Sequence, residues 1–230
     1  DLFAQKDKIL EIAEAIGINQ VSQAGIEADD LMYSIAKERA QDGDISVFVT
    51  SDKDMGQALS DSVFMYDSFK DIIIDTKSFE EKNGFPVSKL PFYFSLLGDT
   101  SDNIPGVRGV GKKGALELVQ QFDSLEQLYD NLDEVKKPRT RNALQEHKDN
   151  AFLSKKLFLL QYHKTGLTKD IFAFNSDHWI KAVPIFQELE FKSLVAELNG
   201  KSMAQSAESI IKQLKKYDFK TVVTQEDLDD

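Results

Sequence analysis

Carboxylate side chains gather in three short motifs whose spacing could hold metal ions. The motifs are Glu27-Ala28-Asp29-Asp30, Asp52-Lys53-Asp54 and Gly98-Asp99-Thr100-Ser101-Asp102-Asn103. In an extended segment, residues i and i+2 point the same way about 6.6 Å apart. Asp52 and Asp54 could therefore face one ion, and the first motif repeats this spacing. Asp99 and Asp102 are three residues apart and would share a face if their loop coils into a turn.

Each acidic motif by itself has a simpler interpretation, because acidic residues often cap helix N-termini. The three together are more informative. If six or seven carboxylates converge, each pair at about 5 Å costs on the order of 3 kcal/mol at an effective dielectric near 20. A fold tolerates several such pairs only if cations neutralise them. Two divalent ions about 4 Å apart would do so and would assist in-line attack of water on a phosphodiester.

The residue types restrict which metal such a site would take. The chain has no cysteine and only three scattered histidines, which nearly excludes structural zinc. Oxygen ligands point instead to magnesium, manganese or calcium. The absence of cysteine also suits a cytoplasmic protein, and no apolar run reaches the length of about 18 residues that a membrane span needs.

Predicted strands and helices alternate in the first part of the chain. The predicted strands are 18–22, 45–50, 63–66 and 72–75, and the predicted helices are 4–16, 28–40 and 53–59. This alternation implies an α/β unit with a largely parallel sheet, in which the apolar run 45–50 is buried. Ligands of open α/β sheets bind beyond the carboxyl ends of the strands, where the first two acidic motifs stand.

After about residue 77 the pattern predicts helices only. They are 78–83, 88–97, 111–121, 124–130, 140–147, 149–161, 178–189 and 191–198. Between two of them lies the glycine-rich segment 104–114, which reads IPGVRGVGKKG. It contains a G-x-G-x-x-G pattern and nearly matches a P-loop, but both motifs require a preceding strand that is not predicted here.

A glycine hairpin between two helices is the context that fits this segment. Glycines let the backbone approach a phosphate closely, and the N–H groups that begin helix 111–121 favour an anion. Such an element grips a DNA backbone without reading its sequence, although a glycine loop without any ligand is the simpler alternative. We expect the DNA contacts at Gly106, Arg108, Gly109, Gly111, Lys112 and Lys113.

The charge balance argues mildly against nucleic-acid binding. The net charge is −11, whereas a nucleic-acid binder usually carries a basic surface. The two observations agree if acid is concentrated at a metal site while local basic patches hold DNA. Lys136, Lys137, Arg139 and Arg141 form a second basic group, which is either a solvated loop or an extension of the DNA track.

The three motifs and the hairpin, in this order and spacing, resemble the 5′-nuclease domain of bacterial DNA polymerase I, a relative of flap endonucleases and phage 5′-exonucleases. The residues that carry the resemblance are Glu27–Asp30, Thr50–Met55, Gly98–Val107 and Gly109–Lys112, and Leu189–Leu194 resembles the closing segment of that domain. Tyr217–Val223 more weakly resembles the start of the 3′–5′ exonuclease-like domain that follows in polymerase I.

The resemblance implies a mostly parallel, twisted, PIN/resolvase-like α/β sheet followed by a helical helix–hairpin–helix region that binds DNA. It implies cleavage at 5′ ends and flaps with two Mg²⁺ or Mn²⁺ ions, and K⁺ bound at the hairpin. The implied metal ligands are Glu27, Asp29, Asp30, Asp52, Asp54, Asp99 and Asp102. Asp52 and Asp54 would also act in catalysis, with Lys53 neutralising charge at the phosphate. The implied partner is duplex DNA with a 5′ end or flap, met by a monomer associated with the bacterial nucleoid.

The resemblance also suggests how the chain is divided. We expect part of the nuclease core at 1–77, the helical region at 78–199, a linker at 200–216 and the start of another domain at 217–230. Family members begin with a strand that carries a catalytic Asp and continue with a basic helical arch, and neither is matched. We therefore expect a fragment cut at both ends, whose own activity is impaired.

Two other functions compete with the nuclease hypothesis. The chain could be a non-catalytic module that binds duplex DNA through the hairpin. It could also belong to a related RNase with the same acidic core, although the hairpin and the helices after it favour DNA. Binding without a Mg²⁺-dependent product would support the first alternative.

Overall fold

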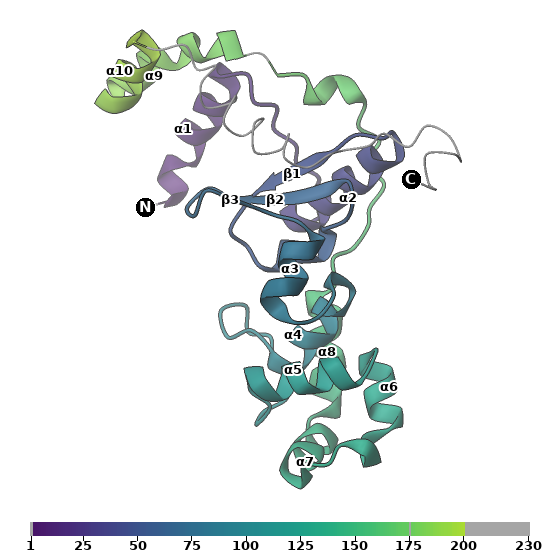
Figure 1. The fold of residues 1–230 in the computed structure, drawn as a ribbon. Helices are drawn as coiled ribbons and strands as arrows, with labels where there is room; N and C mark the ends of the chain where they lie inside the picture. Colours follow the sequence, from purple (N-terminus) through teal and green to yellow (C-terminus); the bar gives the residue numbers. More distant parts are fainter. Residues whose placement is uncertain (1, 175, 201–230) are drawn as a thin grey trace. The chain divides into compact units, whose positions relative to one another are not determined.

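The computed structural model describes residues 2–174 and 176–200, which form two compact units (Figure 1). Unit 1 contains the described residues up to Val21 and from Leu167 onward, and unit 2 contains Ser22–Gly166. The predicted linker from residue 201 onward and the predicted strand and helix after it lie outside the described residues. The predicted domain division at residue 77 stays a prediction.

Unit 2 begins with an α/β part and continues with helices. Its elements are α2 (Ala28–Gln41), β1 (Ser46–Val49), the 3₁₀ helix η1 (Asp54–Ala58), β2 (Val63–Asp67), β3 (Ile72–Ile74), α3 (Thr76–Asn83), η2 (Val87–Lys89), α4 (Leu90–Leu97), α5 (Lys112–Gln121), α6 (Leu125–Asp130), η3 (Leu132–Glu134), α7 (Pro138–Glu146) and α8 (Lys148–Phe158). The predicted order of an α/β part followed by helices is confirmed.

The described sheet has three strands in the order β1-β2-β3. β1 and β2 are parallel, with Phe48 opposite Met65, as expected for strands joined by a crossover. β2 and β3 are antiparallel, which departs from the parallel expectation. Only four residues, 68–71, join β2 to β3, and a connection this short allows a hairpin but no crossover.

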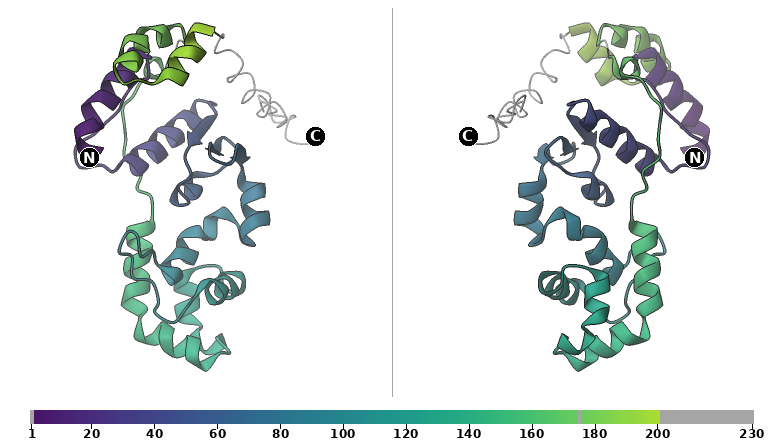
Figure 2. Two further views of the ribbon diagram at one scale, coloured as in Figure 1. Left: turned by 90° about the vertical axis from the view of Figure 1, so that its left-hand side faces the viewer. Right: turned by 90° about the vertical axis from the view of Figure 1, so that its right-hand side faces the viewer.

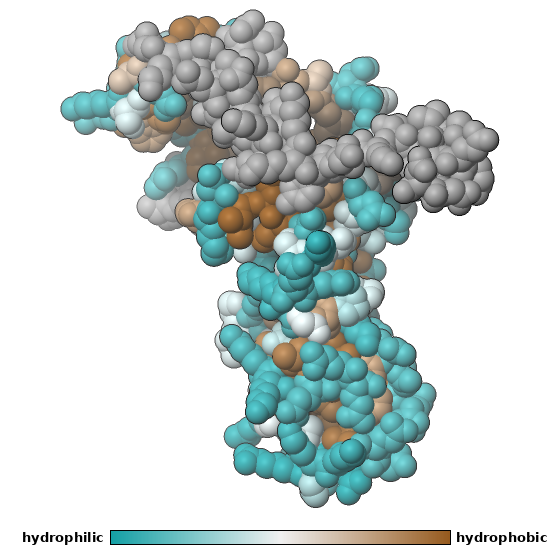
Figure 3. All heavy atoms as spheres, viewed as in Figure 1, coloured by the Kyte–Doolittle hydropathy of each residue, from teal (hydrophilic) through white to brown (hydrophobic). Residues whose placement is uncertain are grey.

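Two strand predictions were wrong in detail. The segment 18–22 forms no strand, because α1 (Leu2–Ala15) ends in a turn at Gly17, with φ +79°, and Ile18 donates its N–H back to the Ala13 carbonyl at 2.9 Å. The run 45–50 does form β1, but it is not fully buried, since Val49 is 67% exposed. On the face drawn in Figure 3, apolar side chains gather over the sheet, and hydrophilic side chains cover most of the helical region.

One hydrophobic core runs through unit 2 from the sheet into the helices. Met55 and Leu96 are almost completely buried in it. The antiparallel neighbours α4 and α8 pack through Phe94 and Phe158, whose ring centroids lie 4.5 Å apart (Figure 2). α8 therefore fixes the position of α4, which leads directly into the third acidic motif.

Unit 1 is helical in its described residues. It comprises α1, η4 (Lys169–Phe172), η5 (Ser176–Ala182), α9 (Val183–Glu188) and α10 (Lys192–Gly200). Ile16, directly after α1, packs with Ala182 and Phe186 in a small core of its own, which joins the N-terminal helix to the later helices of this unit. The predicted helix 178–189 is split, because Pro184 at the start of α9 interrupts it. None of the helices in residues 2–174 and 176–200 combines the length and apolar character needed to cross a bilayer.

Candidate functional site

The first acidic motif lies at the N-terminus of α2. Glu27 is the exposed N-cap residue, and Asp29 and Asp30 stand in the first helical turn. The extended spacing expected for Glu27 and Asp29 was wrong, because the helix already begins at Ala28. Carboxylates are favoured in a first turn, where they meet free N–H groups and the positive end of the helix dipole.

The second acidic motif follows β1 and begins η1. The Asp52 carboxylate accepts the Asp54 N–H at 2.9 Å, and Lys53 has helical backbone angles. This local hydrogen bond nucleates a 3₁₀ turn, so the expected extended arrangement of Asp52 and Asp54 was wrong. Asp52 remains exposed, whereas Asp54 is half-buried, and its Oδ1 atom is buried without any hydrogen-bond partner.

The third acidic motif is a closed loop after α4. Asp99 and Ile104 exchange backbone hydrogen bonds of 2.9 and 2.7 Å, which returns the chain on itself. The Asp99 side chain is buried, pairs with the Lys53 ammonium and accepts the Ser101 N–H at 2.9 Å. The hydrogen bond from Lys53 is the main reason that the pKa of Asp99 falls to about 2. Asp102, in contrast, is exposed.

Electrostatic interactions show that the three motifs lie near one another. Burial, followed by repulsion from Asp52, raises the pKa of Asp54 to about 6, and Asp99 and Asp102 repel the same carboxylate. Burial and then Asp52 also raise the pKa of Asp29, with smaller repulsion from Asp102. The fold therefore gathers negative charge from α2, η1 and the loop after α4 into one region.

The donor set fits a hard divalent cation in chemistry, but the described residues do not yet surround one. All candidate ligands are carboxylates, and the orphaned Asp54 Oδ1 is an oxygen without a partner. No three acidic or histidine side chains in residues 2–174 and 176–200 are close enough together to hold an ion. Lys53 occupies one oxygen of Asp99, so a cation that binds there must displace this ammonium.

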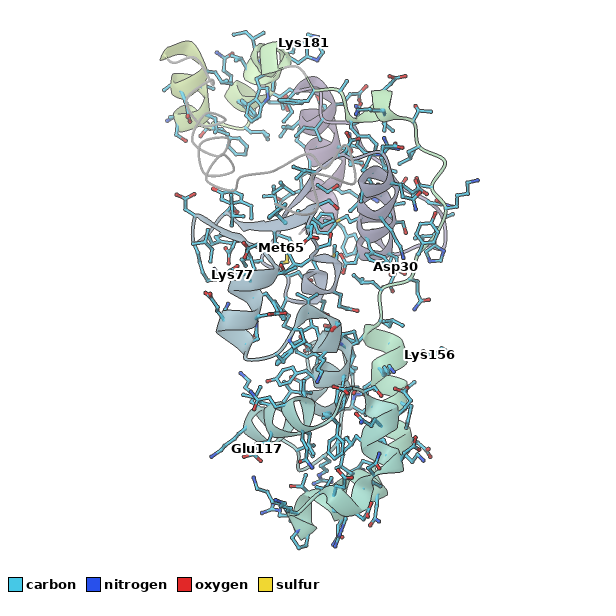
Figure 4. The ribbon with its side chains drawn as sticks, turned by 45° about the vertical axis from the view of Figure 1, so that its right-hand side comes forward. Asp30, Met65, Lys77, Glu117, Lys156 and Lys181 are labelled. Carbon is cyan, nitrogen blue, oxygen red and sulfur yellow. The ribbon has the colours of Figure 1, made fainter. Side chains whose placement is uncertain are left out.

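Asp30 is oriented differently from the other carboxylates. Its Oδ1 atom accepts the N–H of Gln161 at 2.7 Å, and its Oδ2 atom lies 3.8 Å from His163 Nε2. Figure 4 shows Asp30 on α2 beside the extended segment that leaves α8. Asp30 was predicted as a metal ligand, and in this structure its carboxylate bonds the backbone of the segment after α8.

The loop that carries the third motif depends on two glycines. A Cβ on Gly106 would lie 2.5 Å from the Gly98 nitrogen, and a Cβ on Gly98 would lie 2.5 Å from the Ile104 carbonyl oxygen. The Gly106 N–H is buried and donates to Ser154 Oγ on α8 at 2.9 Å. Gly106 was predicted to contact DNA, but its N–H is already used internally and is not available to a phosphate.

The rest of the glycine hairpin is open to solvent, as a phosphate grip requires. Arg108, Gly109, Gly111, Lys112 and Lys113 are all exposed. Gly111 is the N-cap of α5 and provides no side chain to bond the first helical N–H groups. These N–H groups point out of the helix end toward an incoming anion, and two lysines flank them.

The second basic group lies across from the hairpin on α7. Arg108, Gly109 and Arg139 line one shallow pocket with Asn142 and His147. Lys137 is ion-paired with Glu117 of α5, and both side chains are exposed. The geometry thus places Arg139 next to the hairpin, while Lys137 helps to fasten α7 to α5.

Sequence reasoning missed the polar residues that hold the motifs in place. The Gln57 side-chain amide makes two hydrogen bonds at the end of α8. It donates to the Phe158 carbonyl at 2.7 Å and accepts the Leu160 N–H at 3.3 Å. Ser154 is fully buried on α8, and a polar residue on the buried face of a predicted helix was the one available signal. Glu38 and Thr165 gave no signal at all, because their contact joins segments far apart in the chain.

Two family models match the chain side by side. Residues 1–84 match the N-terminal resolvase-like domain of 5′-3′ exonucleases, and residues 85–174 match their C-terminal SAM fold. The chain belongs to the 5′-3′ exonuclease family. This membership confirms the resemblance stated from the acidic motifs and the glycine hairpin, and it confirms the α/β and helical fold class.

Relatives of this 5′-3′ exonuclease family chain occur in several bacteria. DNA polymerase I of Caldicellulosiruptor bescii is 33% identical over 213 residues, which are 89% of this chain and 25% of that protein. DNA polymerase I of Bacillus subtilis is 32% identical over 96% of this chain and 26% of its own length. The 5′-3′ exonuclease of Buchnera aphidicola subsp. Schizaphis graminum is 36% identical over 68% of this chain and 56% of that protein. The chain therefore spans only part of each relative.

A solved structure supports the fold. The T5 D15 protein, co-crystallised with metal ions, superposes with a TM-score of 0.56 at 22% sequence identity, over 60% of this chain and 51% of that chain. The same T5 flap endonuclease has also been solved as a pseudo-enzyme-product complex with DNA and metal ions, again with a TM-score of 0.56. At this identity the likeness establishes the shared fold of the exonuclease family.

Proposed function

We propose that the protein carrying this chain is a structure-selective 5′-nuclease of the DNA polymerase I type, which hydrolyses phosphodiesters at 5′ ends and flaps. The observation that carries the proposal is the gathering of carboxylates from three separate elements, marked by the raised pKa of Asp54. An accumulation of like charge that includes a buried, unpartnered oxygen is costly unless a cation binds there.

Mg²⁺ or Mn²⁺ is the proposed cofactor. Its ligands would be carboxylates of the three motifs, of which only that of Asp99 is buried: Glu27, Asp29, Asp52, Asp54, Asp99 and Asp102. Bound divalent ions would activate water and stabilise charge on the phosphate. Lys53 would be released from Asp99 and would then neutralise phosphate charge, because its flexible side chain is 53% exposed.

Duplex DNA is the proposed partner, held at the glycine hairpin. Gly109, Gly111, Lys112 and Lys113 present N–H groups and positive charge on one exposed end of α5, and Arg108 lies beside them. We also propose K⁺ at backbone carbonyls of the hairpin, which duplex affinity in K⁺ compared with Na⁺ would test. The proposed working form is a cytoplasmic, nucleoid-associated monomer.

The decisive experiment compares the full-length protein with its Asp52→Asn variant on a 5′-flap substrate. Asparagine keeps the size of the side chain and an oxygen that can accept the Asp54 N–H, but it removes the charge. We expect Mg²⁺-dependent cleavage to fall at least about a hundredfold, within the range that catalytic electrostatic groups supply. An unchanged rate would refute the role of Asp52.

A non-catalytic module that binds duplex DNA is the second hypothesis for the protein that carries this chain. The observation in its favour is that no three acidic or histidine side chains of the described residues lie close enough together to hold an ion. The hairpin, in contrast, is exposed, and no side chain caps the N-terminus of α5. Duplex binding without any Mg²⁺-dependent product from the full-length protein would support it. Cleavage of the flap would exclude it.

A further inference from the structure

The segment that leaves α8 pairs with one face of α2 in a regular ladder. The backbone N–H groups of Gln161, His163 and Thr165 donate in turn to side-chain oxygens of α2. The pairs are Gln161 to Asp30 Oδ1 at 2.7 Å, His163 to Ser34 Oγ at 2.9 Å and Thr165 to Glu38 Oε1 at 2.8 Å. Alternate residues of the segment thus meet every fourth residue of the helix.

The two repeats match in length, which explains how three pairs form in succession. Asp30 to Glu38 spans eight helical residues, or about 12 Å. Gln161 to Thr165 spans four residues of extended chain, or about 13 Å. An extended backbone can therefore follow the face of α2 with each second N–H opposite an acceptor. Ser34 is fully buried in the ladder, and its hydroxyl donates a hydrogen bond to the Asp30 backbone carbonyl at 2.6 Å.

The end of the ladder at Glu38 is closed by additional hydrogen bonds. The Thr165 hydroxyl donates to Glu38 Oε2, and the Tyr162 hydroxyl donates to Oε1 at 3.3 Å. Burial alone would raise the pKa of Glu38, but the hydrogen bonds from Thr165 and Tyr162 outweigh it and leave the pKa lowered. Glu38 is thus held as a charged acceptor at a site remote from the acidic motifs.

The same segment is tied to the other two acidic motifs. Gln57, three residues after Asp54, bonds Phe158 and Leu160 at the start of the segment. Ser154, one turn earlier on α8, holds the N–H of Gly106 at the end of the third motif's loop. Residues 154–165 therefore contact the element behind each of the three motifs.

We propose that residues 154–165, called the strap below, position the acidic motifs relative to one another, and that Asp30 is a positioning residue rather than a direct metal ligand. The proposal rests on the proposed function, since it concerns how the nuclease site is held. Asp30 Oδ1 is occupied by the strap, and its side chain is only 17% exposed. The carboxylates at Glu27 and Asp29 are carried on the same helix end and would move with the strap.

The first experiment separates the two roles of Asp30 in the full-length protein. Asp30→Asn keeps an oxygen that can accept the Gln161 N–H, whereas Asp30→Ala does not. We expect Asp30→Asn to cleave the flap substrate with a Mg²⁺ half-saturation within about threefold of the parent. Asp30→Ala should raise that value about 10- to 100-fold, the range reported for outer partners of metal ligands. If Asp30→Asn is as damaging as Asp30→Ala, the carboxylate charge itself is required and the proposal fails.

The second experiment acts at the far end of the strap. Glu38→Ala removes both Thr165 hydrogen bonds, and Glu38→Gln retains an acceptor. We expect Glu38→Ala to speed amide hydrogen exchange at Gln161, His163 and Thr165 at least about tenfold and to raise the Mg²⁺ half-saturation several-fold. Glu38→Gln should restore most of both, and the exposed Glu81→Ala on α3 should change neither. Faster exchange with an unaltered Mg²⁺ response would show that the strap is merely structural.

Asp52→Asn distinguishes failure of this proposal from failure of the proposed function. If Asp52→Asn abolishes cleavage while Glu38→Ala leaves the Mg²⁺ response unaltered, the nuclease assignment stands and the strap proposal is overturned. If Asp52→Asn has no effect, the nuclease site is wrongly placed. The exchange rates at Gln161, His163 and Thr165 still report in that case whether Asp30 and Glu38 hold the strap.

Discussion

Gly98 and Gly106 lie with their backbones in direct contact, so that neither position has room for a side chain. Both have positive φ angles, +69° and +59°, which glycine adopts without strain. Their contact closes the loop that holds Asp99 against Lys53. A glycine first interpreted as a DNA contact is therefore a structural part of the acidic site.

Gly106→Ala tests this contact. A Cβ there would meet backbone atoms of Leu97 and Gly98 at 2.5–2.7 Å, and the backbone cannot move aside cheaply. We expect the free energy of unfolding to fall by about 3 kcal/mol, from overpacking and from the left-handed φ together. Urea denaturation measures the loss. Gly114→Ala on α5 is the matched control, since its Cβ would meet only Val110 at 3.6 Å and should leave stability equal or slightly raised.

Lys53→Met tests the ion pair with Asp99. The lowered pKa of Asp99, about 2, means that the ionised carboxylate favours the folded state above its ordinary pKa of 3.8, and that this contribution is lost as pH falls through 2. Without Lys53 the buried carboxylate loses its cation. We expect a loss of about 2 kcal/mol near neutral pH that shrinks as pH approaches 2.

Chemical denaturation of the Lys53→Met protein across this pH range checks the expectation. The exposed Lys156→Met on α8 is the control and should be neutral at every pH. A loss of stability that stays constant down to the most acid pH would mean that Lys53 stabilises the fold by packing on Phe94, whose ring centroid lies 5.1 Å from its ammonium.

Asp54 should make the stability of the metal-free protein depend on pH. Burial and repulsion from Asp52 raise its pKa to about 6, above the ordinary 3.8. The folded state therefore binds a proton that the unfolded chain releases, and stability without divalent ions should fall as pH rises from about 4 to about 6. Denaturation in a chelator should show this slope, and Asp54→Asn should flatten it. Parallel profiles for the two proteins would contradict the assignment.

Added Mg²⁺ should act on Asp54 in the opposite direction. A cation near the carboxylate favours the ionised form, so its pKa should drop from about 6. Carbon NMR of the Asp54 carboxyl, titrated with and without Mg²⁺, measures the change directly. A titration curve that Mg²⁺ leaves in place would mean that no ion binds beside Asp54.

The hairpin lysines should contribute to DNA affinity through phosphate contacts. Each lysine that neutralises one phosphate adds about 0.9 to the slope of log affinity against log salt concentration. We expect Lys112→Ala and Lys113→Ala each to weaken duplex binding regardless of sequence and to reduce the slope by about one. Lys77→Ala, an exposed lysine on α3, is the control. An unchanged salt slope in both hairpin variants would remove the hairpin from the DNA interface.

Local patterns sufficed for most helices and for the choice of site residues. The predicted helices 28–40 and 111–121 match α2 and α5 almost to the residue, because amphipathic spacing and capping act within one segment. The wrong predictions have a common cause. Whether 18–22 forms a strand depends on a partner strand, and whether 45–50 is buried depends on what packs against it. The residues of the segment alone determine neither.

The sequence by itself determined the family and the three acidic motifs, since both depend on residue types at short spacing. Only the tertiary structure decided how the motifs are held. Asp30 and Gln161 are 131 residues apart in the sequence, and Gly106 and Ser154 are 48 apart. No local sequence pattern could therefore predict either hydrogen bond. The Asp30 carboxylate and the Gly106 backbone N–H both have hydrogen-bond partners that lie far away in the sequence, and only folding brings these partners into reach.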